Sequence, residues 1–239
     1  MFFSWSETGI YHKNNNGVNQ DVIVTNENKD MMVAAVCDGV SSCKYAREGA
    51  EIAGSSVSSF LADKYRKLIH YDKRMIATKT INHICYDLEK EAKTRGRDVN
   101  EYSSTISAVL YDRKAGRILC VNVGDAIIAA LTEDGVEIIG KPQMGYNGCY
   151  VSTTKEVDRV TDVSIIDAVK YKSVFICTDG MWKAFYDGEK ISGDVIKIIM
   201  KESYDELIDY IRRNLEMDDR SIVVMMLKGE VYDKSKRIS

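Results

Sequence analysis

Three apolar runs of the chain end on an aspartate that stands directly next to a glycine. They are VAAVCDGV (33–40), ILCVNVGDA (118–126) and SVFICTDGM (173–181). Short apolar runs of this kind predict buried β-strands. A strand that ends in Asp fixes the carboxylate at the edge of the core, and a glycine there lets the chain turn and leaves its carbonyl open to a ligand. A single Asp–Gly is also a common turn signal, so the argument depends on the repetition.

The rest of the pattern predicts an α+β protein. Residues 44–69 and about 72–95 carry apolar side chains at helical spacing, and small residues in the first of these helices would let it lie close to a sheet. Strands or short β-prone segments are expected at 1–10, 20–25, 31–37, 104–112, 116–123, 126–131, 135–140, 164–169, 171–178 and 220–227, short helices at 180–186, 191–201 and 203–215, and an irregular loop at 141–163. Antiparallel strands with segregated helices indicate a sandwich, whereas the βαβ alternation of a parallel nucleotide-binding sheet is missing.

Composition limits the classes of function. The 239 residues carry a net charge of −3, which argues against nucleic-acid binding driven by bulk charge. No apolar run approaches the roughly 18 residues of a membrane-spanning helix. The six cysteines include no CxxC pair and are expected as free thiols in a reducing cytoplasm. We therefore expect a monomeric cytoplasmic protein with one domain over 1–228 and a charged, flexible tail over 229–239.

Aspartates at the strand ends suggest a site for divalent cations. The set comprises Asp21, Asp38, Asp125, Asp179 and the pair Asp218–Asp219. No Lys or Arg stands near them in sequence as an obvious partner, so convergent carboxylates would repel one another and their pKa values would rise. Oxygen-only ligands favour magnesium, manganese or calcium over zinc or copper. Two such ions that share a carboxylate can make a bridging hydroxide at neutral pH, which can attack phosphorus.

Six short motifs occur in an order that resembles the metal-dependent serine/threonine protein phosphatases of type 2C. They are NQD, VCDGVSSCKYAREGA, SSTISAV, VNVGDA, FICTDGMW and DDRSIVV, and the resemblance runs from about Gly9 to Leu227. It implies a central antiparallel β-sandwich flanked by helices in four layers (α-β-β-α), with metals in a cleft at one end. It also implies a metal-dependent phosphatase that acts on a phosphorylated protein, with a partner kinase as one option, and uses two Mn²⁺ or Mg²⁺ ions with room for a third, weaker one.

The resemblance assigns roles to individual residues. It places metal ligands at Asp21, Asp38, Gly39, Asp125, Asp179 and Asp218. Asp38 would bridge the two main ions, and Gly39 would bind one of them through its carbonyl. Asp179 and Asp218 would be terminal ligands of the other ion. Asp21 would lie close to the metal waters, and Asp125 would help to hold the third ion.

Several positions depart from the family pattern. Gln20 stands where many members have Glu, so the second ion would be held more weakly, and Asp219 replaces the usual asparagine. No histidine follows Asp38 to act as a general acid. The usual phosphate-binding arginine is replaced by His12, followed by Lys13. His12 would bind phosphate or protonate the leaving alkoxide, with Lys13 as a second substrate-binding residue; a solvated turn residue is the other interpretation of His12.

Two further functions stay open from the sequence. A regulatory binding module that has lost useful turnover would agree with Gln20, with the missing arginine and with Ala126–Ile127 in place of the usual residues. Against it, an idle cluster of buried carboxylates is costly. A metal-dependent hydrolase of small phosphoesters would use the same chemistry as a protein phosphatase, and only substrate profiling separates the two.

Overall fold

The computed structural model describes residues 1–143, 161–213 and 217–227. Its strands are β1 (Phe2–Glu7), β2 (Asp21–Glu27), β3 (Met31–Asp38), β4 (Ile106–Asp112), β5 (Arg117–Val123), β6 (Ile127–Leu131), β7 (Val136–Gly140), β8 (Asp162–Asp167), β9 (Ser173–Cys177) and β10 (Arg220–Met226). Its α-helices are α1 (Ile10–Asn14), α2 (Ala46–Leu68), α3 (Lys73–Arg95), α5 (Asp179–Trp182), α6 (Gly193–Met200) and α7 (Tyr204–Arg212), and the short 3₁₀ turns are Val99–Tyr102 and Ala168–Lys170.

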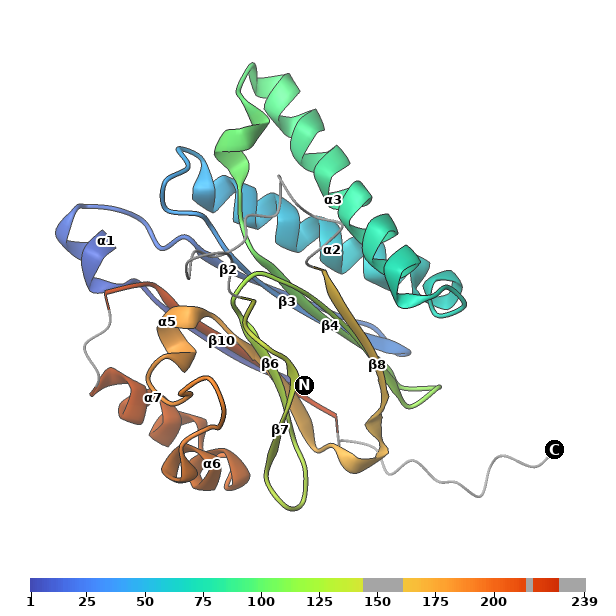
Figure 1. Cartoon of the computed structure of the whole chain (residues 1–239), viewed down its shortest axis with the longest axis vertical. Coiled ribbons are helices and arrows are strands. Elements are labelled where there is room, and N and C mark those ends of the chain that lie inside the picture. The colour runs from blue at the N-terminus through green and yellow to red at the C-terminus, as the bar shows by residue number, and fades with distance from the viewer. Residues whose placement is uncertain (144–160, 214–216, 228–239) are drawn as a thin grey trace.

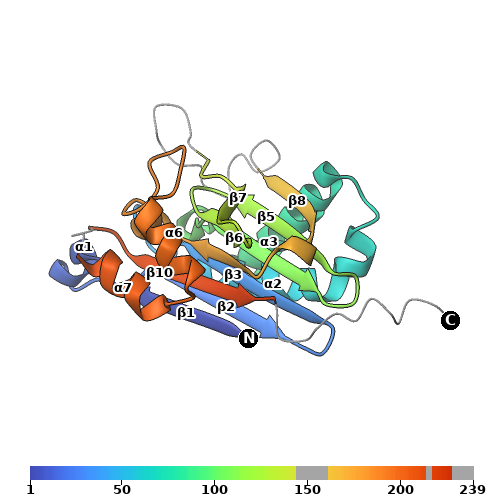
Figure 2. The ribbon, with the colours of Figure 1, turned by 90° about the horizontal axis from the view of Figure 1, so that it is seen from below.

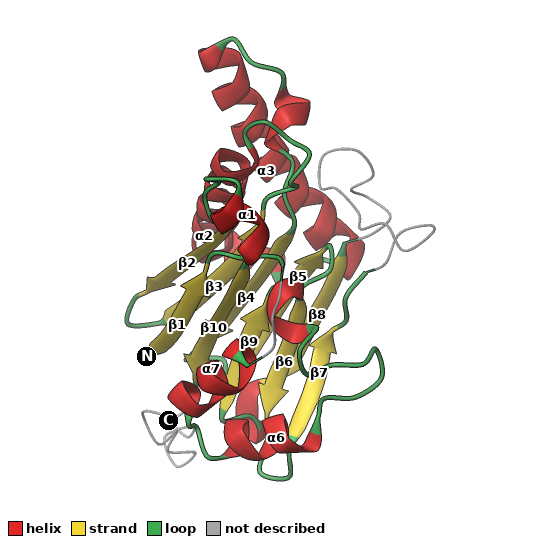
Figure 3. Cartoon of the chain, turned by 90° about the vertical axis from the view of Figure 1, so that its left-hand side faces the viewer, coloured by secondary structure: helices red, strands yellow, loops and turns green. Residues whose placement is uncertain are grey.

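The strands form two antiparallel sheets of five strands each, packed face to face (Figure 1). One sheet has the order β1-β10-β9-β6-β7, and the other has the order β2-β3-β4-β5-β8. Helices α2 and α3 cover the second sheet, while α6 and α7 cover the first, on the opposite outer face (Figures 2 and 3). The predicted α+β sandwich of four layers is therefore confirmed.

Strand β3 shows how the apolar core divides between the layers. Met32, Ala34 and Val36 point into the core between the two sheets. The alternate residues, Val33 and Ala35 among them, point toward α2 and α3. Because successive side chains of a strand face opposite sides, a strand buried on both faces must be apolar throughout. This is why the sequence runs without a polar residue up to the carboxylate at its end.

Helix α2 lies close to its surroundings, as its small residues predict. Ala50 and Ala53 are fully buried. A Cβ on Gly49 would stand 2.1 Å from the carbonyl oxygen of Tyr102, so no larger residue fits there without a shift of the backbone. Helix α3 begins where Asp72 accepts a hydrogen bond from the Met75 amide at 2.8 Å, and it ends at Gly96 in the left-handed conformation (φ 64°), as expected.

Some expected elements differ from those observed. Helix α1 was not expected, and β1 ends at Glu7 because α1 begins at Ile10. The helix expected at 180–186 covers only Asp179–Trp182. Most of the loop expected at 141–163, and the tail expected at 229–239, lie outside the described residues. In the part of the chain that is described, no helix has the length and apolar character needed to cross a bilayer.

Candidate functional site

Antiparallel pairing brings the predicted aspartates to one end of the sandwich. In the register of β2 with β3, Asp21 lies directly opposite Asp38. On the other sheet, Cys177 at the end of β9 pairs with Ile127 at the start of β6 and with Ile222 near the start of β10. The segments that carry Asp179, Asp125 and Asp218 therefore leave or enter that sheet on the same side. We call Asp21, Asp38, Asp125, Asp179 and Asp218 the carboxylate cluster.

Asp125 stands where the chain crosses from one sheet to the other. Strand β5 ends at Val123 and β6 begins at Ile127 in the opposite sheet. Gly124 makes the crossing with φ 106°, and a Cβ at this position would stand 2.6 Å from Cγ2 of Thr105. A side chain is excluded here by both conformation and space, so glycine is required to present Asp125.

The members of the carboxylate cluster act strongly on one another. Burial raises the pKa of Asp38 well above its ordinary value, and each of the other four carboxylates raises it further. Burial and neighbouring carboxylates raise the pKa of Asp21 to about 8, although the hydroxyls of Ser221 and Thr178 oppose the rise. Burial and Asp179 raise the pKa of Asp125 to about 7. The pKa of Asp218 is raised by the same two causes. The rise that the sequence predicts is thus present.

The donor set suits hard divalent cations. Oδ2 of Asp21 accepts a hydrogen bond from Oγ1 of Thr178 at 2.8 Å, whereas Oδ1 is buried and makes no hydrogen bond within the described residues. Oε1 of Gln20 is also buried and also makes no hydrogen bond within the described residues. In that part of the chain, no three His, Cys, Asp or Glu side chains have the spacing of a formed metal site. Oxygen donors without partners, next to carboxylates that repel one another, are what Mg²⁺ or Mn²⁺ would satisfy.

One expectation about the cluster is wrong. The sequence offered no obvious basic partner, yet Nζ of Lys183 lies 2.6 Å from Oδ2 of Asp179, and the two residues are four apart in the chain. This spacing places two residues on the same face of a helix. The signal was available in the sequence, because Asp179 is the first residue of α5 and Lys183 directly follows that helix.

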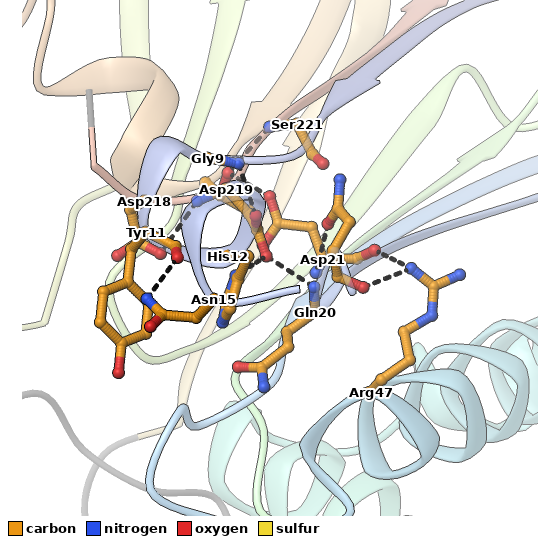
Figure 4. A network of polar contacts seen from close by, with 12 residues as sticks. Gly9, Tyr11, His12, Asn15, Gln20, Asp21, Arg47, Asp218, Asp219 and Ser221 are labelled. Atoms are coloured by element: carbon orange, nitrogen blue, oxygen red, sulfur yellow. Dashed lines mark hydrogen bonds and ion pairs between the residues drawn. The ribbon is translucent and has the colours of Figure 1, made fainter. Parts of the chain in front are cut away.

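Asp218 and Asp219 have separate surroundings, which distinguishes their roles. Oδ1 of Asp219 accepts a hydrogen bond from the Gly9 amide at 2.7 Å, and Oδ2 accepts one from the Gln20 amide at 2.6 Å (Figure 4). Nδ1 of His12 lies 2.9 Å from the same Oδ2. We call these four residues the Asp219 network. Asp218 instead shares the field of Asp179 and Asp38, so it is the member of the pair that faces the cluster.

His12 and Lys13 lie on α1, and their surroundings differ. His12 is buried, and because a carboxylate only accepts hydrogen bonds, Nδ1 must donate to Asp219. Nε2 of His12 makes no hydrogen bond within the described residues. Lys13 is exposed, with Nζ 3.6 Å from Oε1 of Glu7. His12 is thus buried and fixed against Asp219, so the interpretation as a solvated turn residue is wrong. The catalytic role of His12 and the substrate-binding roles of His12 and Lys13 stay predictions.

Gly39 and the side chain of Arg47 hold the backbone around Asp21 and Asp38 in place. The Gly39 amide donates to the Gln20 carbonyl at 3.2 Å, and a Cβ on Gly39 would stand 2.6 Å from the backbone of Ala46, so the start of α2 requires glycine there. Nη1 of Arg47 donates to the carbonyls of Asn19 and Asp21 at 2.9 and 2.8 Å (Figure 4). Arg47 was not predicted, and an arginine in a helix carries no sequence signal for such contacts.

Comparison with known proteins confirms the resemblance seen in the sequence. The model of the family described as Protein phosphatase 2C matches residues 8–216. A solved bacterial serine phosphatase superposes with a TM-score of 0.72 at 14% identity, over 96% of this chain and 98% of that one. The serine/threonine phosphatase Stp1 from Staphylococcus aureus gives 0.70 at 15% identity, over 95% of each chain. RsbX in complex with magnesium gives 0.57 at 12% identity, over 94% of each. At these identities the structures show a common fold. No curated protein sequence matches the chain.

Proposed function

The chain belongs to the protein phosphatase 2C family, and on that basis we propose that it is a metal-dependent serine/threonine protein phosphatase. The observation that carries the proposal is the carboxylate cluster, in which the four other members all raise the pKa of Asp38. Such repulsion is relieved by divalent cations. Manganese or magnesium ions, when bound, supply an activated water at neutral pH and neutralise the oxygens of the phosphoryl group.

The chain's own residues would divide the work as follows. Asp38, opposite Asp21 in the register, would hold two ions together, and the Gly39 carbonyl would add a ligand to one of them. Asp179 and Asp218 would be terminal ligands of the other ion. Asp125, at the crossing between the sheets, is the remaining candidate ligand for a weaker ion. Phosphorylated serine or threonine on a protein, including a partner kinase, would be the substrate.

His12 would contact the substrate phosphate or the leaving group. Asp219 accepts the hydrogen of Nδ1 and so fixes the ring. When the ring carries its second proton, on Nε2, that N–H would donate to phosphate or protonate the leaving alkoxide. Asp219 acts through His12 and is therefore a positioning residue. Lys13 next to His12 would add positive charge for the substrate, although it now lies near Glu7.

A catalytically weak regulatory module is the second candidate, and one observation favours it. Gln20 stands at the family's acidic position and is neutral, and its buried Oε1 has no hydrogen-bond partner within the described residues. A neutral ligand holds a divalent ion more weakly than a carboxylate does. Such a protein would bind metal with little turnover.

Phosphate release separates the candidates. We expect the protein to hydrolyse a phosphothreonine peptide and an aryl phosphate with Mn²⁺, and to stop when a chelator is added. His12→Ala should lower kcat or raise KM at least severalfold. His83→Ala is the matched control, because His83 is a half-exposed histidine on α3, paired with Asp87. No change in kcat or KM for His12→Ala would return His12 to a structural role.

Other outcomes select the alternatives. Absence of turnover, with Mn²⁺ still raising the melting temperature, would support the regulatory module. Absence of both turnover and any metal effect would limit the resemblance to the fold. Faster turnover of small phosphoesters than of the peptide would favour a small-molecule hydrolase.

A further inference from the structure

Glu7, at the end of β1, has three positively charged side chains around it. Nη2 of Arg220 donates to Oε2 of Glu7 at 2.7 Å, and the two residues lie opposite each other in the register of β1 with β10. Nζ of Lys13 lies 3.6 Å from Oε1 of the same carboxylate, and Nε of Arg212 lies 3.6 Å from Oε2. We call Glu7, Lys13, Arg212 and Arg220 the basic cluster. Its single negative charge is outnumbered by its positive charges.

The three cations of the basic cluster are held to different degrees. Arg220 is only 8% exposed, and its Nη1 also donates to the carbonyl of Ile211 at 3.3 Å, so it is part of the folded structure. Lys13 and Arg212 are 51% and 52% exposed, and ion pairs as exposed and as long as theirs contribute little. Among the described residues, neither is paired with another carboxylate. Both can therefore turn to an anion that arrives from solvent.

The basic cluster lies beside the candidate site. Lys13 directly follows His12 on α1, and Arg212 is the last residue of α7. Figures 1 and 2 show α1 and α7 on the same side of the molecule. The guanidinium of Arg212 lies 5.6 Å from the centre of the Trp5 ring, which supports its position next to Glu7. An anion bound between Lys13 and Arg212 would therefore lie near a phosphate group held by His12.

We propose that Lys13 and Arg212 form a second anion site, which binds an acidic or a second phosphorylated side chain of the substrate peptide. The inference rests on the proposed function and deepens it, because it names a class of substrate: phosphopeptides with a further anionic side chain close to the phosphorylated residue. The planar guanidinium of Arg212 suits a carboxylate or a phosphate. The whole chain carries a net charge of −3, so the attraction comes from this local group and not from the overall charge.

Matched peptides test the inference. Each contains one phosphothreonine and one Glu, placed from one to four residues away on either side, because an extended peptide advances only about 3.3 Å per residue. The reference peptides carry Gln in place of Glu, and a third set carries a non-hydrolysable phosphonate there. With Mn²⁺ present, we expect kcat/KM to be about two- to fivefold higher for Glu than for Gln at one or two neighbouring positions. The phosphonate should give a larger preference because it carries more charge. The Glu and phosphonate sets thus distinguish the two sources of the anion.

Substitutions connect this preference to the two side chains. Arg212→Met and Lys13→Met should each lower the ratio of kcat/KM for Glu over Gln peptides toward one, whereas Arg212→Lys should keep most of it. Arg66→Met is the matched control, because Arg66 is also exposed and lies 3.4 Å from a carboxylate, that of Asp30, beyond the end of β2 that is remote from Asp21. It removes the same charge and should leave the ratio unchanged. Added salt should shrink the ratio in the original chain.

The outcomes separate this inference from the proposed function. Equal kcat/KM for Glu, phosphonate and Gln peptides at every position would overturn the inference, and so would a preference that Arg212→Met and Lys13→Met both retain. Release of phosphate from the Gln peptides would leave the proposed function standing in either case. If no peptide is hydrolysed, the proposed function fails, and fluorescence anisotropy of the labelled peptides decides on the anion site. Tighter binding of the Glu or phosphonate peptide that is lost in Arg212→Met would support the site, and equal binding would overturn it.

Discussion

Asp219 and Asp38 are both aspartates at the edge of the core, yet their surroundings are opposite. The carboxylate of Asp219 accepts hydrogen bonds from two backbone amides and from His12. The carboxylate of Asp38 lies in the field of four other carboxylates. Donors of this kind stabilise a buried anion without any ligand, whereas the repulsion between like charges is relieved by a cation or by protonation. The Asp219 network is therefore part of the folded structure, whereas we expect the carboxylate cluster to be completed by bound divalent cations.

The largest effect is expected when the centre of the cluster loses its charge. Asp38→Asn should lower Mn²⁺-dependent turnover about a thousandfold or more, because the two ions lose their shared ligand. In chelator its melting temperature should not fall, since a repelling charge is removed. Phosphate release and thermal unfolding measure the two effects. Asp194→Asn on α6, where the side chain is exposed and paired only with Lys197 among the described residues, should change neither. Undiminished turnover would remove Asp38 from the mechanism.

Neutralising Asp219 should, unlike neutralising Asp38, lower the stability of the metal-free protein. Asp219→Asn keeps the shape but turns an amide group toward an N–H donor, so we expect the free energy of unfolding to fall by about 2–4 kcal/mol. Urea unfolding in chelator measures it. Asp209→Asn, exposed on α7, is the control. A loss below about 0.5 kcal/mol would mean that the hydrogen bonds of the Asp219 network contribute little.

The metal-free protein should lose stability as the pH rises. The pKa of Asp21 is raised to about 8 and that of Asp125 to about 7, from an ordinary value of 3.8. Between pH 3.8 and these raised pKa values, Asp21 and Asp125 keep protons in the folded state that they have lost in the unfolded state. This contribution to stability is therefore complete below about pH 4 and is lost as the pH rises through 7 and 8.

Unfolding free energies at several pH values in chelator test this dependence. The fall should be smaller in Asp125→Asn, which no longer titrates at that position. Mn²⁺ should reduce the fall, because the ion favours the ionised carboxylates. Stability that rises steadily to pH 8 in the metal-free chain, with no difference in Asp125→Asn, would contradict the repulsion within the cluster.

The smallest effect is expected at the support of the cluster. Arg47→Met removes two hydrogen bonds to backbone carbonyls, from a side chain that is 40% exposed, so we expect a loss of about 0.5–1.5 kcal/mol. Arg74→Met, at an exposed position of α3, is the matched control. Equal unfolding free energies for the two variants would show that Arg47 does not support Asp21.

Local patterns predicted most of the fold. The apolar run before Asp38 predicted β3, and the small residues of 44–69 predicted the close approach of α2, where Gly49 lies against Tyr102. Helix α1 was missed because IYHKN is too short to show a period. It depends on contacts with Asp219 and Met217, which lie about two hundred residues away in the chain.

The candidate site could be predicted only in part, because local patterns show its residues but not the contacts between distant segments. Each aspartate could be recognised at the end of its strand, but the register that sets Asp21 opposite Asp38 depends on how the strands pair. The separate role of Asp219 depends on Gly9 and His12, which lie far away in the amino-terminal segment. Lys183 is the exception, because its four-residue spacing from Asp179 was present in the sequence and was not used.

The most direct measurement of the central claim is the melting temperature of the chelator-treated protein as Mn²⁺ is added. A ligand that binds only the folded state raises the melting temperature as its concentration increases. We predict a saturable rise of several degrees in the original chain and little or none in Asp38→Asn. A melting temperature that does not change as Mn²⁺ is added, or that rises equally in Asp38→Asn, would contradict a metal site at the carboxylate cluster.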